Sequence, residues 1–269
     1  MRVLITNDDG VSAPGIHALA AAVAGTHDVV VAAPQDEASG MSAALTAVVS
    51  DGQIVISSYE MPGVAAYGVA ASPAYIVVLA SLGVFGLPPD VVLSGINRGA
   101  NAGRAVLHSG TVGAALTAAN YGMRAMAVSL DVLNPDAAVS AASGGNAIVV
   151  PSDDVLHWPA AAAAAAGLMD AVASVPAGTV LNVNVPDRPQ SELREATLAS
   201  FGQAGIAVAE AGEGYVRTTI ERSGEKLIPG TDLALLAEGY ATVTALRPPV
   251  EVAGVRIPAQ RSPRSPGGG

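Results

Sequence analysis

The chain has 269 residues and a formal charge of −10; 51% of its residues are hydrophobic, only 3% are aromatic and none is cysteine. This length is enough to bury one large aliphatic core. The lack of cysteine excludes disulfides, thiolate metal sites and cysteine nucleophiles. Both halves of the chain are acidic, so we expect no nucleic-acid partner, because such binding needs a basic face.

Apolar segments in this sequence are short. The N-terminus turns polar at Thr6 and lacks the apolar stretch and cleavage site of a signal peptide. No apolar run approaches the roughly 20 residues of a membrane span. We therefore expect no membrane partner and a cytoplasmic protein.

Buried strands and helices alternate along the first two thirds of the chain. Strands are expected at residues 3–6, 29–33, 91–93, 125–130 and 180–185. Helices are expected from the start at Ser12-Ala13-Pro14 and over residues 74–84, 111–121 and 159–175. Short apolar strands separated by helices predict an α/β fold with a doubly wound, mostly parallel sheet.

The remaining segments break this alternation. Residues 134–154 have no strong period and are interpreted as a surface insertion in a core that spans residues 1–186. Residues 215–220 and 240–246 are β-like, with Gly-rich turns between them, and are interpreted as a hairpin arm. We expect residues 187–250 to form a β-rich oligomerisation arm that returns to the core, and residues 251–269 to form a tail with a disordered end.

Two adjacent carboxylates, Asp8 and Asp9, follow the first strand. Like charges side by side need a cation or hydrogen bonds to offset their repulsion. Neighbours on a strand point to opposite faces, so both reach one ion only if the chain turns, and Gly10 permits that turn. Such oxygen ligands suit Mg²⁺, Mn²⁺ or Ca²⁺. The alternative is a solvated loop in which an Asp caps the next helix.

Polar segments follow two further strands. Residues 34–40 include Ser39, whose hydroxyl is a candidate ligand, although an ordinary turn is the simpler explanation of this segment taken alone. Residues 94–103 include Asn97 and Asn101 among three glycines. Amide oxygens coordinate hard cations, and glycines let the backbone approach a ligand. The glycine spacing matches neither the Walker motif nor GxGxxG.

The segment Ser109-Gly110-Thr111 opens the helix expected at residues 111–121. Free backbone N–H groups and two hydroxyls make an anion site there. A Ser or Thr helix cap with nothing bound is the equally good alternative. Cation ligands and an anion site in one fold favour phosphoryl transfer, because both offset charge on the transferring group.

Several motifs in this order resemble those of the SurE family of survival-protein nucleotidases. They are ITNDDG at 5–10, SG at 39–40, SGIN at 94–97 with Gly99, Asn101 and Gly103, and SGTVGAA at 109–115. Further matches are LNVNVP at 181–186, Gly230-Thr231-Asp232 and Glu238-Gly239-Tyr240. The resemblance spans residues 1–250, and the NDDG and SGTV motifs are specific in combination.

This resemblance implies a Rossmann-like three-layer α/β/α core with a C-terminal β-hairpin extension that helps to form homodimers or homotetramers. It implies hydrolysis of nucleoside 5′- and 3′-monophosphates with one divalent cation, Mg²⁺ or Mn²⁺, per subunit. The implied metal ligands are Asp8, Asp9, Ser39 and Asn97. The implied phosphate-binding residues are Ser109, Gly110 and Thr111, with Asn101 close by. The implied catalytic residues are Asp8, Asp9, Asn97, Ser109 and Thr111.

The chain departs from the family's usual pattern at positions that are not expected metal ligands. It has Asp36-Glu37-Ala38 where basic or amide residues usually occur, Ala71-Ser72-Pro73-Ala74-Tyr75 in place of Gly-Thr-Pro-Ala-Asp, and His108 in place of Tyr. These departures bear on the substrate more than on the reaction. The alternative function is a metal- and nucleotide-binding family member with an altered substrate or weak hydrolysis. We prefer a structural role for His108 and assign no histidine to catalysis.

Overall fold

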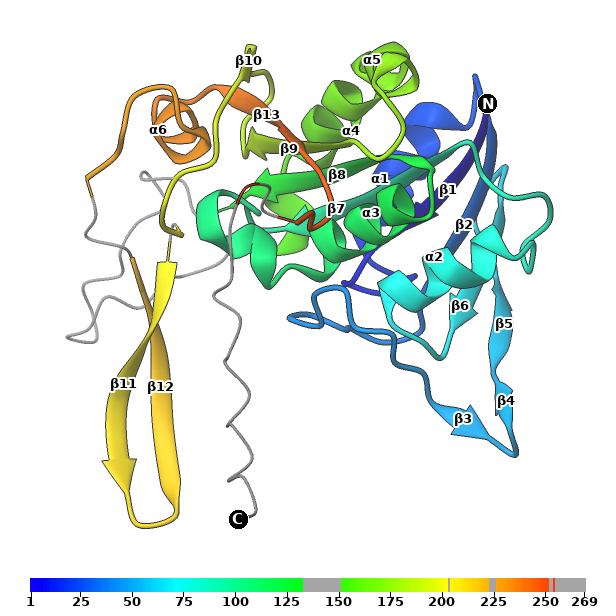
Figure 1. Ribbon diagram of the computed structural model, residues 1–269, viewed down its shortest axis with the longest axis horizontal. Coiled ribbons are helices and arrows are strands. Elements are labelled where there is room, and N and C mark those ends of the chain that lie inside the picture. Colours follow the sequence, from blue (N-terminus) through cyan, green and yellow to red (C-terminus); the bar gives the residue numbers. More distant parts are fainter. Residues whose placement is uncertain (133–150, 203, 223–225, 252–253, 255–269) are drawn as a thin grey trace, which may run out of the picture.

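A nine-stranded sheet forms the centre of the computed structural model, which describes residues 1–132, 151–202, 204–222, 226–251 and 254 (Figure 1). The strand order is β10-β13-β9-β8-β7-β1-β2-β6-β5. The strands of this sheet are β1 (Arg2–Thr6), β2 (Asp28–Pro34), β5 (Ile56–Tyr59), β6 (Ala65–Val69), β7 (Val91–Arg98), β8 (Arg124–Asp131), β9 (Val180–Pro186), β10 (Leu193–Glu195) and β13 (Ala241–Leu246). Neighbours are parallel except β5 with β6 and β13 with β9. The predicted mostly parallel sheet is confirmed.

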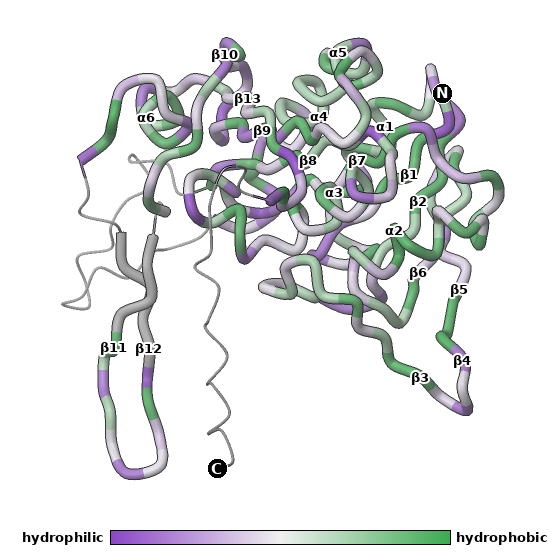
Figure 2. The backbone as a smooth tube through the Cα atoms, in the orientation of Figure 1, coloured by the Kyte–Doolittle hydropathy of each residue, from purple (hydrophilic) through white to green (hydrophobic). Residues whose placement is uncertain are grey.

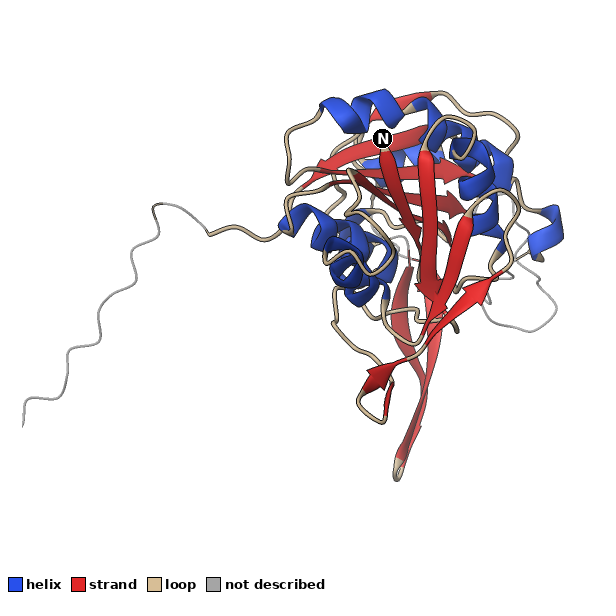
Figure 3. Cartoon of the chain, turned by 90° about the vertical axis from the view of Figure 1, so that its right-hand side faces the viewer, coloured by secondary structure: helices blue, strands red, loops and turns tan. Residues whose placement is uncertain are grey.

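Helices cover both faces of this sheet. They are α1 (Pro14–Val23), α2 (Pro73–Ser81), α3 (Gly110–Asn120), α4 (Trp158–Gly167), α5 (Met169–Ser174) and α6 (Asp232–Ala237). Alternate residues of β1 enter different cores, because side chains alternate across a strand. Val3 and Ile5 pack in the core under α1, α4 and α5, whereas Leu4 packs in the core under α2 and α3. The three layers are seen edge-on in Figure 3.

The two cores consist almost entirely of aliphatic side chains. Figure 2 shows the hydrophobic character of β1, β2 and β6, which are buried on both faces and therefore lack polar alternation. Buried alanines such as Ala114, Ala115 and Ala118 let α3 lie close to the sheet. The low aromatic content of the sequence is thus accommodated by close helix–sheet packing.

Helix α1 begins at Pro14 with Ala13 as its N-cap, as expected from the predicted start at residues 12–14. Other predicted boundaries differ from the structure. The helix predicted at residues 159–175 divides into α4 and α5 at Leu168. Strand β7 continues past Leu93 to Arg98, because β1 pairs with it as far as Ser94 and β8 pairs with Asn97 and Arg98, after a register shift between Ser94 and Asn97.

The C-terminal region contributes both to the sheet and to a separate hairpin. Strands β11 (Ala204–Gly212) and β12 (Tyr215–Arg222) form an antiparallel hairpin that projects from the body (Figures 1 and 3). Residues 240–246 belong to the main sheet instead, because β13 pairs along the length of β9. A second, two-stranded sheet joins β3 (Val49–Ser50) to β4 (Gln53–Ile54).

Two predicted segments fall mainly outside the described residues. These are the insertion at 134–154, of which residues 151–154 are described, and the tail at 251–269, of which Glu251 and Gly254 are described. No helix in the described part of the chain is long and apolar enough to cross a membrane.

The order of the strands fixes where a ligand site can form. From β1 the chain passes through α1 to β2 on one side, and it returns through α2 on the opposite face to β7 on the other side. The carboxyl ends of β1 and β7 therefore meet where the winding reverses, which is where doubly wound sheets bind ligands.

Candidate active site

The carboxyl end of β1 turns sharply to present two carboxylates. Gly10 has a φ of 98°, a conformation that suits glycine, and the Asn7 side chain donates to the Gly10 carbonyl at 2.8 Å. Asp8 is only 3% exposed, and Asp9 is partly buried. The turn predicted from Gly10 is therefore present.

Asp8 lies against the start of α3. The Thr111 hydroxyl donates a hydrogen bond to Asp8 Oδ1, and the backbone N–H groups of Gly110 and Thr111 also interact with this carboxylate. Any Cβ at Gly110 would lie 2.7 Å from Asp8 Oδ2, so only glycine fits there. Burial raises the pKa of Asp8, and these hydrogen bonds offset part of the rise.

Asp9 lies at the end of β7. The backbone N–H of Arg98 donates to Asp9 Oδ2 at 3.3 Å. Burial is the main cause that raises the pKa of Asp9 to about 7, and the negative charge of Asp8 adds to it, with a smaller effect from Glu37. Ionisation of both carboxylates is thus unfavourable unless a cation compensates.

The other two expected metal ligands differ in their placement. Asn97 immediately precedes Arg98, and its amide nitrogen donates to the Gly99 carbonyl at 2.7 Å. Ser39 is exposed, and its hydroxyl donates to Glu37 Oε1 at 2.8 Å. The backbone joins the Ser39 loop to the site, because Ala38 N–H donates to the Asp8 carbonyl at 2.7 Å. Asp8 and Asp9 are adjacent, and Asn97 precedes the residue whose N–H bonds to Asp9, while the Ser39 side chain is bonded to Glu37.

The hydroxyls at the start of α3 already have internal partners. Ser109 is the N-cap residue, and its Oγ accepts from Val112 N–H at 3.0 Å. Because Ser109 accepts in this bond, its own hydroxyl hydrogen is not used there. Thr111 donates its hydroxyl hydrogen to Asp8. The cap predicted as the alternative at this position is therefore present, and Thr111 orients Asp8.

Asn101 is buried in a hydrogen-bond network. Its backbone N–H donates to Asn184 Oδ1 at 2.7 Å and its amide nitrogen donates to Ser129 Oγ at 2.9 Å. Its carbonyl accepts from Asn182 at 2.8 Å and from Asn184 at 3.2 Å. Asp232 holds the same loop through Gly103 N–H at 2.7 Å. Asn182 and Asn184 belong to the LNVNVP motif and Asp232 belongs to Gly-Thr-Asp, but the sequence alone did not indicate that they hold this loop.

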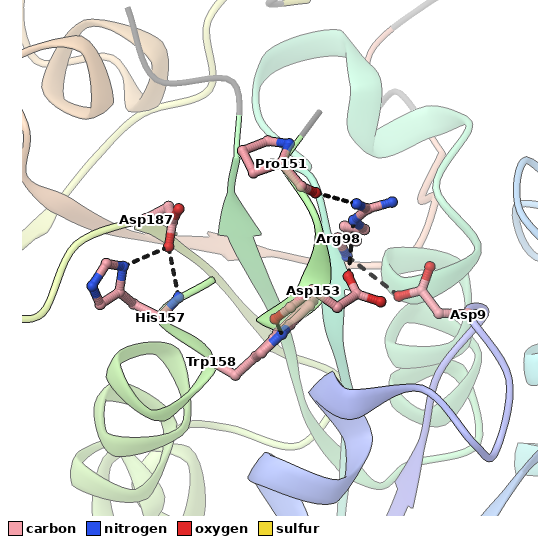
Figure 4. Close-up of polar contacts among 7 residues, drawn as sticks. All are labelled: Asp9, Arg98, Pro151, Asp153, His157, Trp158 and Asp187. Atoms are coloured by element: carbon pink, nitrogen blue, oxygen red, sulfur yellow. Dashed lines mark hydrogen bonds and ion pairs between the residues drawn. The ribbon is translucent and has the colours of Figure 1, made fainter. Parts of the chain in front are cut away.

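Sequence reasoning also missed Arg98, whose side chain links the site to residues 151–158 (Figure 4). The guanidinium donates to the Pro151 carbonyl and lies 3.1 Å from Asp153 Oδ1. The Trp158 indole donates to the Asp153 carbonyl at 3.1 Å. The guanidinium is thereby held toward the segment that follows the insertion.

No histidine of the described segments has a hydrogen bond or ion pair with Asp8 or Asp9. His157 Nδ1 lies 2.9 Å from Asp187 Oδ1 at the start of α4 (Figure 4), and His108 is exposed at the end of a 3₁₀ turn. Within the described ranges, no group of three or more His, Asp or Glu side chains could hold a metal. The expected ligand set fits this result, because it has two carboxylates supplemented by a hydroxyl and an amide.

The fold places this molecule among doubly wound α/β/α proteins, with its candidate site where the carboxyl ends of β1 and β7 meet. The family model described as Survival protein SurE matches residues 3–207. The chain therefore belongs to the SurE family.

Individual relatives agree with this assignment. The 5'-nucleotidase SurE of Nitratidesulfovibrio vulgaris (strain DP4) is 33% identical over 259 residues, which are 92% of this chain and 93% of the relative. The 5'/3'-nucleotidase SurE of Shigella dysenteriae serotype 1 (strain Sd197) is 33% identical over 255 residues, 92% of this chain and 90% of the relative. The crystal structure of the SurE protein from Aquifex aeolicus superposes with a TM-score of 0.69 and 25% identity, covering 92% of this chain and 93% of that chain.

Proposed function

We propose that this protein is a divalent-cation-dependent phosphomonoesterase that hydrolyses nucleoside 5′- and 3′-monophosphates. The observation that carries the proposal is the direct contact between the Asp8 carboxylate and the start of α3. A group suited to hold a cation and a helix end suited to attract an anion thus belong to one site. The names of the relatives described above support the same activity.

In this proposal, Asp8 and Asp9 hold the cation through carboxylate oxygens. Asn97 contributes its amide oxygen, since its amide nitrogen donates to Gly99. Ser39 joins as the fourth ligand once its hydroxyl leaves Glu37. This oxygen set favours Mg²⁺ or Mn²⁺ over Zn²⁺. When bound, the cation supplies Lewis-acid polarisation of the phosphoryl group and lowers the pKa of water.

The residues of α3 orient the cation ligands and the phosphate. Thr111 fixes the direction of Asp8 Oδ1, and Gly110 leaves room for the Asp8 carboxylate. Ser109 offers its hydroxyl hydrogen to a phosphate oxygen while its oxygen caps the helix. The positive end of the helix favours the negative charge that the phosphate brings. Asn101 holds its loop in place, close to the phosphate.

Phosphate release tests this proposal. Purified protein should release phosphate from AMP when Mn²⁺ or Mg²⁺ is present, and EDTA should abolish the release. The same assay should show little activity with Zn²⁺. No release with any of the three metals, from either 5′- or 3′-AMP, would refute the proposed reaction.

One observation favours the alternative of a family member with weak hydrolysis. The Ser39 hydroxyl is bonded to Glu37, a position where the family usually has a basic or amide residue. Breaking this bond would cost part of the cation affinity. Mn²⁺ binding by calorimetry together with slow turnover in the same preparation would support the alternative.

A further inference from the structure

A cavity of about 480 Å³ lies beside the proposed cation site. Its lining comes from two chain segments that follow β2 and from the segment that joins β6 to α2. The lining residues are Pro34, Gln35, Asp36, Ala38, Met41, Thr46, Ala47, Val48, Val69, Ala70, Ala71 and Ser72. This volume lies within the range of small-molecule sites, and the mostly apolar wall with a few polar groups is typical of them.

The cavity is joined to the carboxylates by the loop after β2. Ala38, which lines the cavity, donates its N–H to the Asp8 carbonyl at 2.7 Å. Pro34, which also lines it, accepts from Val11 N–H at 2.9 Å, two residues after Asp9. The loop of residues 34–38 therefore both lines the cavity and contacts the chain at Asp8 and Val11.

The wall of this cavity is preformed. Val48 N–H donates to the Ala70 carbonyl and Ser72 N–H donates to the Thr46 carbonyl, each at 2.8 Å, so the two segments pair like short strands. The Ser72 hydroxyl adds bonds to Ala44 and Thr46. Since these groups bond to one another, a ligand would meet mainly the aliphatic side chains and the Asp36 carboxylate at the rim.

Two departures from the family pattern fall on this wall. Asp36 and Ala38 belong to the first, and Ala71 and Ser72 belong to the second. These departures bear on the substrate, and the cavity is where they come together. Two other cavities share no residue with the loops of the proposed site: one of about 660 Å³ at the start of β6, and one of about 560 Å³ beside α4.

We propose that this cavity binds the nucleoside part of a nucleoside monophosphate whose phosphate lies at Asp8, Asp9 and the start of α3. The inference rests on the proposed function and names the pocket that selects its substrate. Aliphatic walls suit the flat faces of a base, and the Asp36 carboxylate suits a ligand rich in N–H and O–H donors. The negative charge of the same carboxylate would repel a second phosphate group on the ligand. None of the lining residues is aromatic, so contacts with the base are aliphatic.

A larger side chain that occupies the cavity tests this proposal. Ala47→Leu should lower kcat/KM for AMP at least tenfold relative to kcat/KM for glycerol 2-phosphate, which has no base. It should also abolish the saturable binding of adenosine, measured by calorimetry in EDTA. Ala163→Leu places the same side chain in the cavity beside α4 and should change neither quantity.

A second variant covers the case in which Ala47→Leu fails to fold. Asp36→Asn keeps the size of the side chain and should lower the same activity ratio and weaken adenosine binding several-fold. If the ratio of kcat/KM for AMP to kcat/KM for glycerol 2-phosphate and the binding of adenosine are both unchanged in whichever of these variants folds, the cavity does not bind the nucleoside. Absence of phosphate release from both substrates would instead refute the proposed reaction, and adenosine binding would still decide on the pocket.

Discussion

At the residue scale, the Asp8 carboxylate connects β1 to α3. It accepts from the Thr111 hydroxyl and from backbone N–H groups, yet its burial still raises its pKa. Asp9 beside it has a pKa raised to about 7. These two side chains are therefore unfavourable as a pair of anions in the protein alone, and a bound cation would relieve that cost.

Replacing either carboxylate by its amide should abolish most turnover. Asp8→Asn and Asp9→Asn remove one charged ligand each, which weakens cation binding and its effect on water. We expect kcat/KM for AMP at limiting Mn²⁺ to fall by about 100-fold or more, which is the size seen for lost electrostatic stabilisation. Circular dichroism should confirm the fold. Near-full activity in either variant would remove that residue from the site.

Asp9→Asn should also stabilise the cation-free protein. The pKa of Asp9 is raised from 3.8 to about 7 on folding, so its stabilising contribution is complete below pH 4 and is lost as the pH rises through 7. In EDTA at pH 8, Asp9→Asn should therefore raise Tm by about 3–10 °C. When the pH is lowered from 8 to 5, the Tm of the wild type should rise by more than the Tm of the variant. A lower Tm for Asp9→Asn in EDTA would show that the carboxylate stabilises the fold.

The Thr111 hydroxyl should matter through Asp8. Thr111→Val removes the donor to Asp8 Oδ1 and should lower Mn²⁺ affinity about tenfold, since a hydrogen bond to a charged group contributes roughly 1.5–3 kcal/mol. Thr117→Val is the matched control, because Thr117 is on the same helix and its hydroxyl donates to the Gly113 carbonyl. Calorimetric Mn²⁺ binding compares the two. Equal affinities in both variants would mean that Thr111 acts only on phosphate or on helix stability.

At the element scale, β9 holds the loop that follows β7. Asn184 is fully buried and exchanges hydrogen bonds with the backbone of Asn101. The loop carrying Gly99 and Asn101 is thereby fixed relative to the end of β7, where Asn97 lies. A strand with no proposed ligand of its own thus contributes to the geometry of the site.

Asn184→Leu should destabilise the protein and reduce activity together. It leaves the buried Asn101 N–H without its acceptor, which costs about 1–3 kcal/mol. Thr244→Val on the neighbouring strand β13 is the control, because the buried Thr244 hydroxyl has no hydrogen-bond partner in the described part of the chain and its loss should be neutral or stabilising. Thermal unfolding and AMP hydrolysis would be measured on both. An Asn184→Leu protein as stable as the wild type would contradict the structural role.

At the scale of the whole molecule, the β11–β12 hairpin projects from the body, and the family resemblance assigns such a hairpin to self-association. A two-stranded hairpin is marginal in water unless something covers it. Val208 and Val216 are 66% and 61% exposed on this hairpin. We expect a second copy of the chain to cover these side chains in a homodimer or homotetramer.

Charges on the hairpin should therefore shift the protein toward monomer. Val208→Glu combined with Val216→Glu should reduce the mass measured by light scattering at micromolar concentration. Leu82→Glu is the control, because Leu82 is 72% exposed at the end of α2, away from the hairpin. Wild type that is monomeric under these conditions, or an unchanged mass in the double variant, would contradict the assignment.

The layered fold and the position of the carboxylates follow from the pattern of residues along the chain. Continuous apolar runs such as residues 3–6 and 29–33 can be buried on both faces only in a sheet that helices cover on both sides. The Asp8-Asp9-Gly10 run ends one of these strands, so its place at the sheet edge followed from chain order. The resemblance then named the family, and the family model matching residues 3–207 confirmed it.

The partner of each of these groups depends on how distant segments come together in the folded chain. The Thr111 hydroxyl bonds to Asp8 across 103 positions of chain, and Asn101 meets Asn184 across 83. Residues 240–246 pair with β9 instead of extending the hairpin. Local patterns report burial and turns, whereas these choices depend on which distant segment brings a free donor, acceptor or strand edge into contact. Likewise, part of the wall of the cavity beside Ala38 forms where the segments at 46–48 and 70–72 pair.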